Sequence, residues 1–175
     1  RCEDGRYNTD CTIIFVPARI VKQWLSEFKA VMKKGHNLMI NKITDIRDYK
    51  KLNVKTICNT DILIVSYRFL SNNRYRDGLV RASEFYDLSD FNWKRIILDE
   101  AHETNTRLSW LWHFKAKYKW MCTATPFTPK NSINELIKYL YFLTADVDWL
   151  DMGGHVNDEL VEQFLEICRY NNKES

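Results

Sequence analysis

The sequence predicts an α/β fold built around a mainly parallel sheet. Short, uninterrupted apolar runs at 13–16, 62–65 and 96–98 are typical of strands covered on both faces. These runs alternate with segments in which apolar residues recur every three or four positions, as expected for helices that connect parallel strands. The sequence contains no internal repeats or low-complexity segments that would favour another architecture.

The first strand and the helix after it have the clearest pattern. Thr12–Val16 predicts a buried strand, and Pro17 ends it because its fixed φ suits a first helical turn. An amphipathic helix follows, which Gly35 ends. Its apolar stripe consists of Val21, Trp24, Leu25, Phe28 and Val31 or Met32. We interpret Trp24 and Phe28 as core residues rather than a base-stacking pair.

The middle of the chain is less regular. Residues 38–40 predict a short strand before a polar turn, residues 45–51 contain a short helix, and residues 61–67 form a second buried strand. Residues 71–82 form a basic, turn-rich loop, and 83–88 a short helix. The arginines of this loop (Arg74, Arg76 and Arg81) suit either an electrostatic contact with DNA or a plain surface loop.

Two further strands are predicted in the second half. Residues 95–98 form a buried strand that leads directly into the carboxylates of Asp99 and Glu100, and residues 119–123 form a fourth strand. Residues 108–114 are helical. Ser132 and Glu135 form a capping box that starts another helix. A last helix starts at Asn157, after Gly153 and Gly154.

Composition limits the protein class only broadly. At 175 residues, with 45% hydrophobic and 28% charged residues, the chain has about the length and composition of one globular domain. A net charge of +3 neither requires nor excludes a nucleic-acid partner. Five scattered cysteines without a Cys-x-x-Cys pair indicate reduced thiols in an intracellular protein. No apolar stretch approaches the ~20 residues that span a membrane, so no membrane partner is expected.

Polar residues follow three of the predicted strands. These are Pro17–Arg19 after the first strand, Asp99–His102 after the third, and Thr123–Pro126 after the fourth. Because the carboxyl ends of parallel strands share one edge of a sheet, we expect these groups to converge there. Two adjacent carboxylates at such an edge suit a site for Mg²⁺ and a nucleotide, whereas a strand ending in a solvated acidic turn is the alternative.

These segments resemble the motifs of superfamily-2 helicases and translocases, and most closely those of the Swi/Snf-like DNA translocases. Leu98–His102 and Thr123–Pro126 are similar to motifs II and III of that superfamily. Ile14–Arg19, with the tryptophan and phenylalanine of the helix after it, is similar to motif Ia, and Asp61–Tyr67 to motif Ib. Asn131–Leu136 resembles the start of the helix that follows motif III. The order and spacing of the motifs match the family from about residue 12 to residue 143.

The resemblance implies a RecA-like, three-layer αβα ATPase lobe that uses ATP and Mg²⁺. In this family's terms, Asp99 would hold Mg²⁺ and Glu100 would polarise the water that attacks the γ-phosphate. His102, Thr123 and Thr125 would couple the nucleotide to DNA and to a second RecA-like lobe of the same chain. Contacts with the sugar-phosphate backbone of duplex DNA are implied for Pro17, Ala18, Arg19, Ser66 and Tyr67. Lys22, Lys29 and Lys33 suit either a DNA contact or a solvated helix face.

One departure from the family limits what this stretch is expected to do by itself. No Gly-x-x-x-x-Gly-Lys-[Ser/Thr] phosphate loop occurs in the sequence, and the family places that loop before Thr12. We therefore expect residues 1–150 to be a partial N-terminal lobe and residues 151–175 to start a helical extension or insertion. The 175 residues alone are expected neither to hydrolyse ATP nor to move DNA.

The function predicted for the full-length protein is that of a DNA-dependent ATPase that moves along duplex DNA. The alternatives are a viral transcription-associated or strand-separating superfamily-2 ATPase, and a non-catalytic lobe that binds DNA or a protein. The expected location is the nucleus or, for a viral protein, a cytoplasmic factory or virion.

Overall fold

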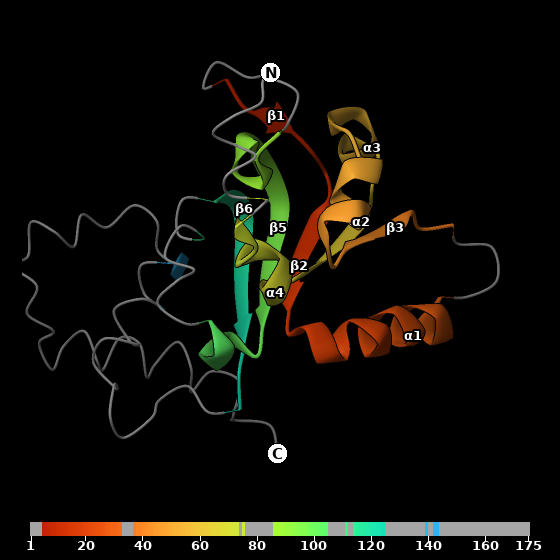
Figure 1. Ribbon diagram of the computed structural model, residues 1–175, viewed down its shortest axis with the longest axis vertical. Helices are drawn as coiled ribbons and strands as arrows, with labels where there is room; N and C mark the ends of the chain where they lie inside the picture. Colours follow the sequence, from red (N-terminus) through yellow and green to blue (C-terminus); the bar gives the residue numbers. More distant parts are fainter. Residues whose placement is uncertain are drawn as a thin grey trace, which may run out of the picture. The chain divides into compact units, whose positions relative to one another are not determined.

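The computed structural model describes residues 5–32, 37–73, 75, 86–104, 111, 114–124, 139 and 142–143. The chain divides into two compact units, Arg1–Ala124 and Thr125–Ser175. The first unit contains the elements of Figure 1. They are β1 (Tyr7–Asn8), β2 (Thr12–Val16), η1 (Ala18–Ile20), α1 (Val21–Val31), β3 (Ile40–Ile43), α2 (Ile46–Lys51), α3 (Val54–Cys58), β4 (Ile62–Ser66), α4 (Tyr67–Leu70), η2 (Leu88–Asp90), β5 (Phe91–Asp99), η3 (Ala101–Glu103) and β6 (Lys115–Cys122).

The described strands form one six-stranded sheet in which every pairing is parallel. β5 lies between β2 and β6, and β4 and β3 follow β2 outward. Asn92 of β5 pairs with both Asn8 of β1 and Lys115 of β6, so β1 and β6 lie on opposite edges of β5. β1 and β2 therefore lie end to end along the same edge (Figure 1). The predicted α/β fold with a mainly parallel sheet is confirmed.

One face of the sheet is covered by α1. The buried residues Ile14, Val16 and Ile64 form a core cluster with Val21 at the start of the helix. Trp24, Leu25 and Phe28 of α1 pack against this cluster, which confirms the predicted amphipathic helix. Val31 is 76% exposed and does not belong to the apolar stripe, because α1 ends there.

Six aromatic side chains form a second cluster, called the aromatic cluster below. Tyr49 belongs to α2, Phe69 to α4, and Phe91 and Trp93 to the start of β5, while Tyr75 and Tyr86 lie in the chain between α4 and β5. The ring centroids of Phe69 and Tyr75 lie 4.6 Å apart, and those of Tyr49 and Tyr86 lie 4.7 Å apart. Such tilted pairs add attraction to the burial of the rings.

The polar atoms of the aromatic cluster are occupied. The hydroxyls of Tyr49 and Tyr86 each donate to the other residue's main-chain oxygen. The Tyr75 hydroxyl accepts from the Leu88 N–H over 3.3 Å, and the Trp93 indole donates to the Leu88 carbonyl over 3.0 Å. Burial raises the pKa of the three tyrosines well above their ordinary value, because the charged phenolate loses its hydration.

Several boundaries differ from those predicted from the pattern. The third strand runs from Ile40 to Ile43, whereas Leu38 and Met39 are 44% and 49% exposed. Met39 is instead held outside the strand by bonds between its main chain and Asp61. The short helix α3 was not predicted, although the Asn53 side chain caps it by accepting from the Thr56 N–H.

The fourth predicted strand, β6, begins at Lys115, four residues earlier than expected, because it pairs along most of β5. The starts of the predicted helices at Ser132 and Asn157 lie outside the described residues, as do half of 83–88 and most of 108–114. None of the described helices is long and apolar enough to cross a membrane. Cys11, Cys58 and Cys122 are free thiols.

Candidate functional site

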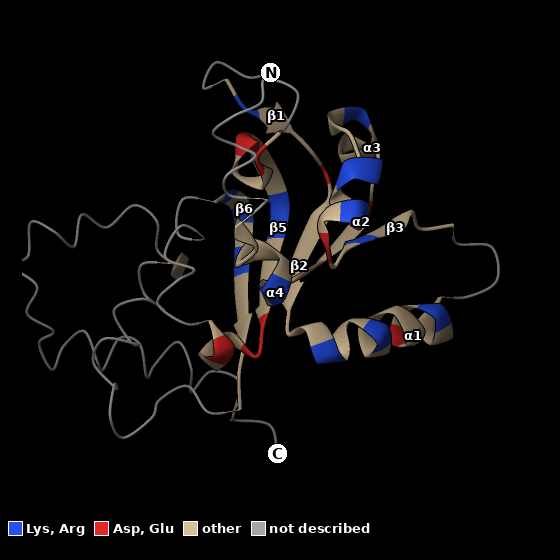
Figure 2. Cartoon of the chain, in the orientation of Figure 1, with Lys and Arg blue, Asp and Glu red and all other residues tan. Residues whose placement is uncertain are grey.

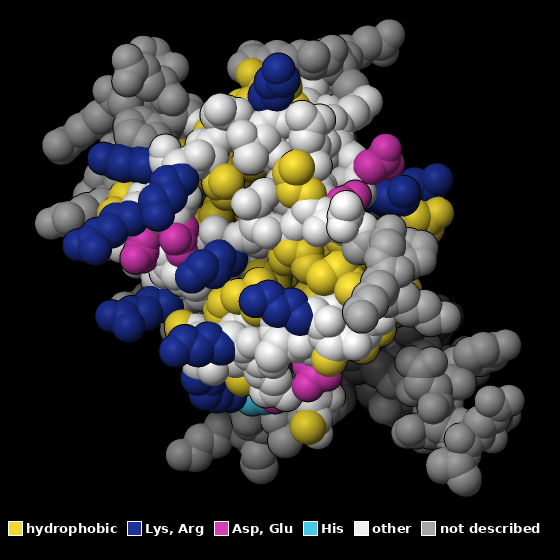
Figure 3. Space-filling view, turned by 90° about the vertical axis from the view of Figure 1, so that its right-hand side faces the viewer, with side chains coloured by type: hydrophobic (Ala, Val, Ile, Leu, Met, Phe, Trp, Pro, Cys, Tyr) yellow, Lys and Arg dark blue, Asp and Glu magenta, His cyan; other side chains and the backbone are white. Residues whose placement is uncertain are grey.

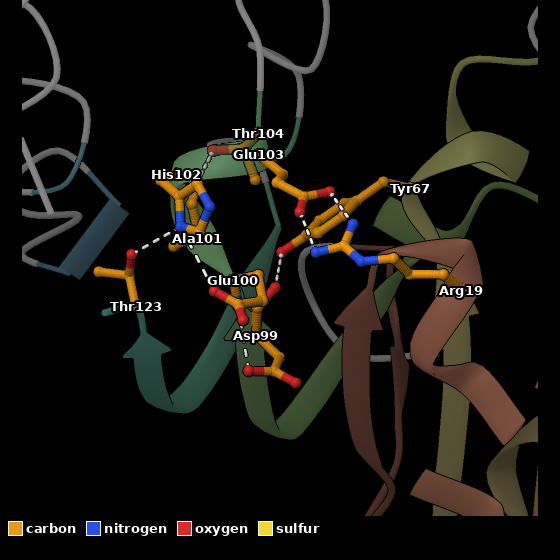
Figure 4. A network of polar contacts seen from close by, with 9 residues as sticks. All are labelled: Arg19, Tyr67, Asp99, Glu100, Ala101, His102, Glu103, Thr104 and Thr123. Carbon is orange, nitrogen blue, oxygen red and sulfur yellow. Dashed lines mark hydrogen bonds and ion pairs between the residues drawn. The ribbon is translucent and has the colours of Figure 1, made fainter. Parts of the chain in front are cut away.

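The carboxyl ends of β2, β5 and β6 lie side by side at one edge of the sheet. Phe15 pairs with Leu98, and Asp99 pairs with Cys122, so the residues after each strand emerge together. Figure 4 shows the resulting network of polar contacts, which contains residues from all three strand ends. Acidic residues gather at the end of β5 and in η3 (Figure 2). The predicted convergence is therefore present, while Thr125 lies outside the described residues.

Asp99 is held by hydrogen bonds from three directions. Its Oδ1 accepts from the Glu100 N–H over 3.0 Å, and its Oδ2 accepts from the Trp24 indole over 2.7 Å. The Tyr67 hydroxyl donates to its main-chain oxygen over 2.9 Å. A carboxylate offers about four acceptor positions, so two bonds leave about half of them for a further ligand.

Glu100 occupies a sharp turn directly after β5. Its φ of 51° and ψ of 51° lie in the left-handed region, which costs a residue with a β-carbon about 1–2 kcal/mol. The turn is closed by the Glu103 N–H, which donates to the Glu100 carbonyl over 2.8 Å, and by the buried Ala101. The Asp99 and Glu100 side chains on either side of the strand end have different partners, Trp24 and His102 respectively.

His102 connects Glu100 with the end of β6. Its Nδ1 lies 2.9 Å from the Thr123 hydroxyl oxygen and 3.4 Å from Glu100 Oε2. The side chains of His102 and Glu100 are 29% and 34% exposed, so each faces both the protein and solvent. The glutamate carboxylate is thereby linked through one imidazole to the segment that follows β6 (Figure 4).

Arg19 and Glu103 join the end of β2 to the same turn. The guanidinium of Arg19 forms a two-pronged ion pair with the Glu103 carboxylate, and one of its bonds is 2.8 Å long. This pair lowers the pKa of Glu103, chiefly through the hydrogen bond from Arg19. The Arg19 side chain is nevertheless 61% exposed, so an anion in solvent can reach it.

The other residues predicted to contact DNA differ in exposure. Ala18 is exposed and Pro17 is buried. The hydroxyl of the buried Ser66 caps α4 by accepting from the Phe69 N–H over 3.2 Å, and Tyr67 is 7% exposed. Ser66 and Tyr67 thus fix the turn from β4 into α4, and Arg68 is the exposed residue at this point.

The acidic edge fits Mg²⁺ that is held mainly through water and phosphate. Among the described residues no group of three or more His, Cys, Asp and Glu side chains is placed to enclose a metal ion. Mg²⁺ at nucleotide sites typically takes one or two carboxylates and completes its shell with water and phosphate oxygens. Asp99, whose carboxylate keeps unused acceptor positions, matches that requirement.

Basic side chains lie on the face that carries α1 to α3. Figure 3 shows Lys and Arg side chains around an exposed hydrophobic area on this face. Lys22 and Lys29 are both exposed, which agrees with either interpretation of the basic helix face, and Lys33 lies outside the described residues. The three arginines of the predicted basic loop also lie outside them.

Two site residues were not identified from the sequence. Trp24 was assigned to the core, and its ring is packed there, but its N–H also bonds to Asp99. Glu103, the partner of Arg19, was not singled out because only the three-dimensional turn brings it to the end of β2. An indole among apolar residues carries one polar atom that needs a partner, and this was the available signal for Trp24.

Comparison with known proteins identifies the family. The model of the SNF2-related domain matches residues 3–150. Transcription termination factor 2 of Drosophila melanogaster is 27% identical over 134 residues, which cover 74% of this chain and 12% of that protein. Helicase SWR1 of Cryptococcus neoformans (strain B-3501A) is 28% identical over 169 residues, which cover 94% of this chain and 12% of that protein. The chain thus spans about an eighth of the length of these relatives.

The fold agrees with that assignment. The SWI2/SNF2 ATPase core of Sulfolobus solfataricus, solved in complex with double-stranded DNA, superposes with a TM-score of 0.51 at 22% sequence identity. The match covers 79% of this chain and 25% of that one. The chain belongs to the SNF2-related domain family, in the Swi/Snf-like branch of superfamily 2, and has the α/β fold of its RecA-like lobe.

Proposed function

We propose that this chain is part of an ATP-dependent DNA translocase, in which ATP hydrolysis drives movement along duplex DNA. The observation that carries the proposal is the gathering of Asp99, Glu100, His102 and Thr123 at one sheet edge, where the Glu100 N–H donates to Asp99 and His102 contacts both Glu100 and Thr123. Arg19 reaches the same edge through its pair with Glu103. Family membership supports it, since the solved structure from Sulfolobus solfataricus is described as an ATPase core in complex with double-stranded DNA.

We assign each residue the role that the resemblance to the family implies. Mg²⁺ bound at Asp99 would neutralise phosphate charge, and this is the chemistry the ion supplies. Glu100 would orient and polarise the attacking water, for which its partly exposed carboxylate is available. His102 and Thr123 would pass the state of Glu100 to the segment after β6, and Thr125 would continue that coupling.

The DNA contact is proposed for the segments after β2 and β4. The exposed Ala18 and Arg19 would meet the sugar-phosphate backbone directly, with Arg19 supplying the charge, and the buried Pro17 would hold the turn that presents them. The buried Ser66 and Tyr67 would contribute indirectly, by fixing the turn into α4 at which Arg68 is exposed. The exposed Arg19 carries a charge-assisted bond to Glu103 that a phosphate group could replace.

We further propose that the active protein contains a second RecA-like lobe and a phosphate loop in addition to these 175 residues. Residues 1–150 would be a partial N-terminal lobe and 151–175 the start of a helical extension. A nuclear location, or a viral factory or virion for a viral protein, fits movement on DNA. A polypeptide of residues 1–175 should neither hydrolyse ATP nor move DNA. DNA-stimulated ATP turnover by that pure polypeptide would contradict this.

The sharpest test of the proposed chemistry is Glu100→Gln in the full-length protein. Loss of the water-polarising carboxylate should lower DNA-stimulated ATP hydrolysis about 10²–10⁴-fold and leave ATP binding nearly unchanged. Glu27→Gln, which neutralises an exposed carboxylate of α1, is the matched control and should hydrolyse ATP normally. Normal turnover in Glu100→Gln would remove Glu100 from the mechanism.

A second experiment separates translocation from its alternatives. A translocase should displace a triplex-forming strand or a protein roadblock from duplex DNA without separating a forked duplex. Unwinding of the fork would favour a strand-separating ATPase. DNA or protein binding without any nucleotide hydrolysis would favour a non-catalytic lobe.

A further inference from the structure

Trp24 connects α1 directly to the carboxylate at the end of β5. Its indole Nε1–H donates to Asp99 Oδ2 over 2.7 Å, although 75 positions separate the two residues in the sequence. A hydrogen bond to a charged acceptor is shorter and stronger than one between neutral groups, and this distance is in the charge-assisted range. The bond therefore holds one particular oxygen of Asp99.

The indole is itself held rigidly. The Trp24 ring packs against the core cluster below α1, and its centroid lies 5.5 Å from that of Phe28 in the next turn of the helix. A ring fixed by packing on a helix can direct its N–H with little freedom. The direction of the Asp99 carboxylate is thus set by the helix and not only by its own strand.

The remaining contacts of Asp99 complete this arrangement. The Glu100 N–H occupies Oδ1 and the Tyr67 hydroxyl occupies the main-chain oxygen, so three different segments fix this residue. With Oδ1 and Oδ2 each accepting one bond, the unused acceptor positions point in fixed directions. Without the indole, the Oδ2 side of the carboxylate would lose its anchor.

We propose that Trp24 is a positioning residue for the metal-binding carboxylate: its indole N–H fixes Asp99 in the orientation that accepts Mg²⁺. This inference rests on the proposed role of Asp99 in holding the ion. Partners that orient a metal ligand commonly contribute about 10–100-fold to metal affinity. Arg19 lies in η1, which leads directly into α1. The helix that holds the carboxylate through Trp24 therefore starts next to the proposed DNA contact.

The test measures metal binding rather than turnover. Mn²⁺, used as a spectroscopic substitute for Mg²⁺, is titrated by electron paramagnetic resonance into the full-length protein with ADP. Trp24→Phe keeps an aromatic ring and removes the N–H, so the Mn²⁺ dissociation constant should rise about tenfold or more. Binding of ADP without metal should stay unchanged.

Trp93→Phe is the matched control, because it also removes one indole hydrogen bond, in this case to the Leu88 carbonyl. It should leave the Mn²⁺ dissociation constant unchanged. In an Asp99→Asn background, Trp24→Phe should cause no further loss of metal affinity, since the carboxylate that it orients has been removed. An equal loss in both backgrounds would show a merely structural effect and overturn the inference.

The outcomes also distinguish this inference from the proposed function. If Asp99→Asn weakens Mn²⁺ binding while Trp24→Phe does not, only the role of Trp24 is overturned. If Asp99→Asn leaves metal binding unchanged, both the proposed role of Asp99 and the inference fail.

A measurement on the unmodified protein covers the case in which Trp24→Phe does not fold. With ¹⁵N-labelled tryptophan, the Trp24 indole resonance should shift when Mg²⁺ and ADP are added, while that of Trp93 should not. A Trp24 resonance that does not move would overturn the inference.

Discussion

The carboxyl edge of the sheet and the aromatic cluster both contain many polar atoms, but they use these atoms differently. In the aromatic cluster, the hydroxyls of Tyr49 and Tyr86 are occupied by each other's main chain, and Trp93 is almost completely buried. At the carboxyl edge, a Glu100 carboxylate oxygen lies 3.4 Å from the His102 ring nitrogen, and both side chains are still about one-third exposed. The aromatic cluster therefore stabilises the fold, whereas the polar side chains of the carboxyl edge can still form hydrogen bonds with a ligand.

The largest effect on stability is expected in the aromatic cluster. Trp93→Ala removes a fully packed ring and its bond to Leu88, and should lower the free energy of unfolding by about 3–5 kcal/mol. Thr123→Ala at the carboxyl edge should lower it by no more than about 1 kcal/mol. Urea unfolding of both variants measures the difference, and equal losses would contradict the proposed separation of the two regions.

Alkaline pH should also act on the aromatic cluster. The raised pKa values of Tyr49, Tyr75 and Tyr86 mean that the unfolded chain loses these protons at a lower pH than the folded protein. Stability is therefore fully present below pH ~10 and falls as the pH rises from there toward the raised pKa values, by up to about 1.4 kcal/mol per pH unit for each tyrosine.

Unfolding measurements between pH 8 and pH 11 follow this loss, and absorbance at 295 nm shows what fraction of the tyrosines has ionised at each pH. Tyr86→Phe should make the decline shallower. If all tyrosines ionised near their ordinary pKa in the folded protein, the predicted effect of burial on the tyrosines of the aromatic cluster would be wrong.

Tyr67 tests the boundary between the two regions, because it is nearly buried and yet donates to Asp99. Tyr67→Phe should lower the free energy of unfolding by about 1 kcal/mol, the usual contribution of one hydrogen bond. It should also reduce ATP hydrolysis, since the Asp99 main chain loses an anchor. Tyr118→Phe, at a ring that is 44% exposed, should alter neither quantity. Loss of stability without any change in hydrolysis would place Tyr67 with the structural residues.

The smallest effect on stability is expected from the exposed Arg19–Glu103 pair, which instead should alter DNA binding. Arg19→Gln should weaken binding to duplex DNA and reduce the slope of log affinity against log salt by about 0.9, as for one lost phosphate contact. Glu103→Gln should tighten binding, because the arginine loses its competing carboxylate. Arg47→Gln on the exposed side of α2 is the control. Identical salt slopes for wild type and Arg19→Gln would exclude the contact.

The sequence was informative where one physical signal dominated. β2 has the predicted bounds, and α1 follows from apolar residues spaced for one helix face. The convergence of Arg19, Asp99 and Thr123 follows from parallel strands alone, once the strands are identified. The family was also predictable, because several motifs occur in the same order and spacing.

Other features depend on contacts that local patterns do not encode. The strand β3 is shifted because pairing with β4 begins at Ile40, and the apolar Leu38 and Met39 look equally suitable in isolation. The bonds of Trp24 to Asp99 and of Arg19 to Glu103 join residues 75 and 84 positions apart. Only the assembled sheet edge brings such pairs together.

The left-handed backbone of Glu100 has a consequence for how this sequence can change over time. A glutamate is an unfavourable residue there, and Gly or Asn would hold the same turn at lower conformational cost. Selection for stability alone would therefore tend to replace it. A copy of this domain that had lost its chemistry should drift toward Gly or Asn at this position, and under the proposed function the glutamate trades stability for activity.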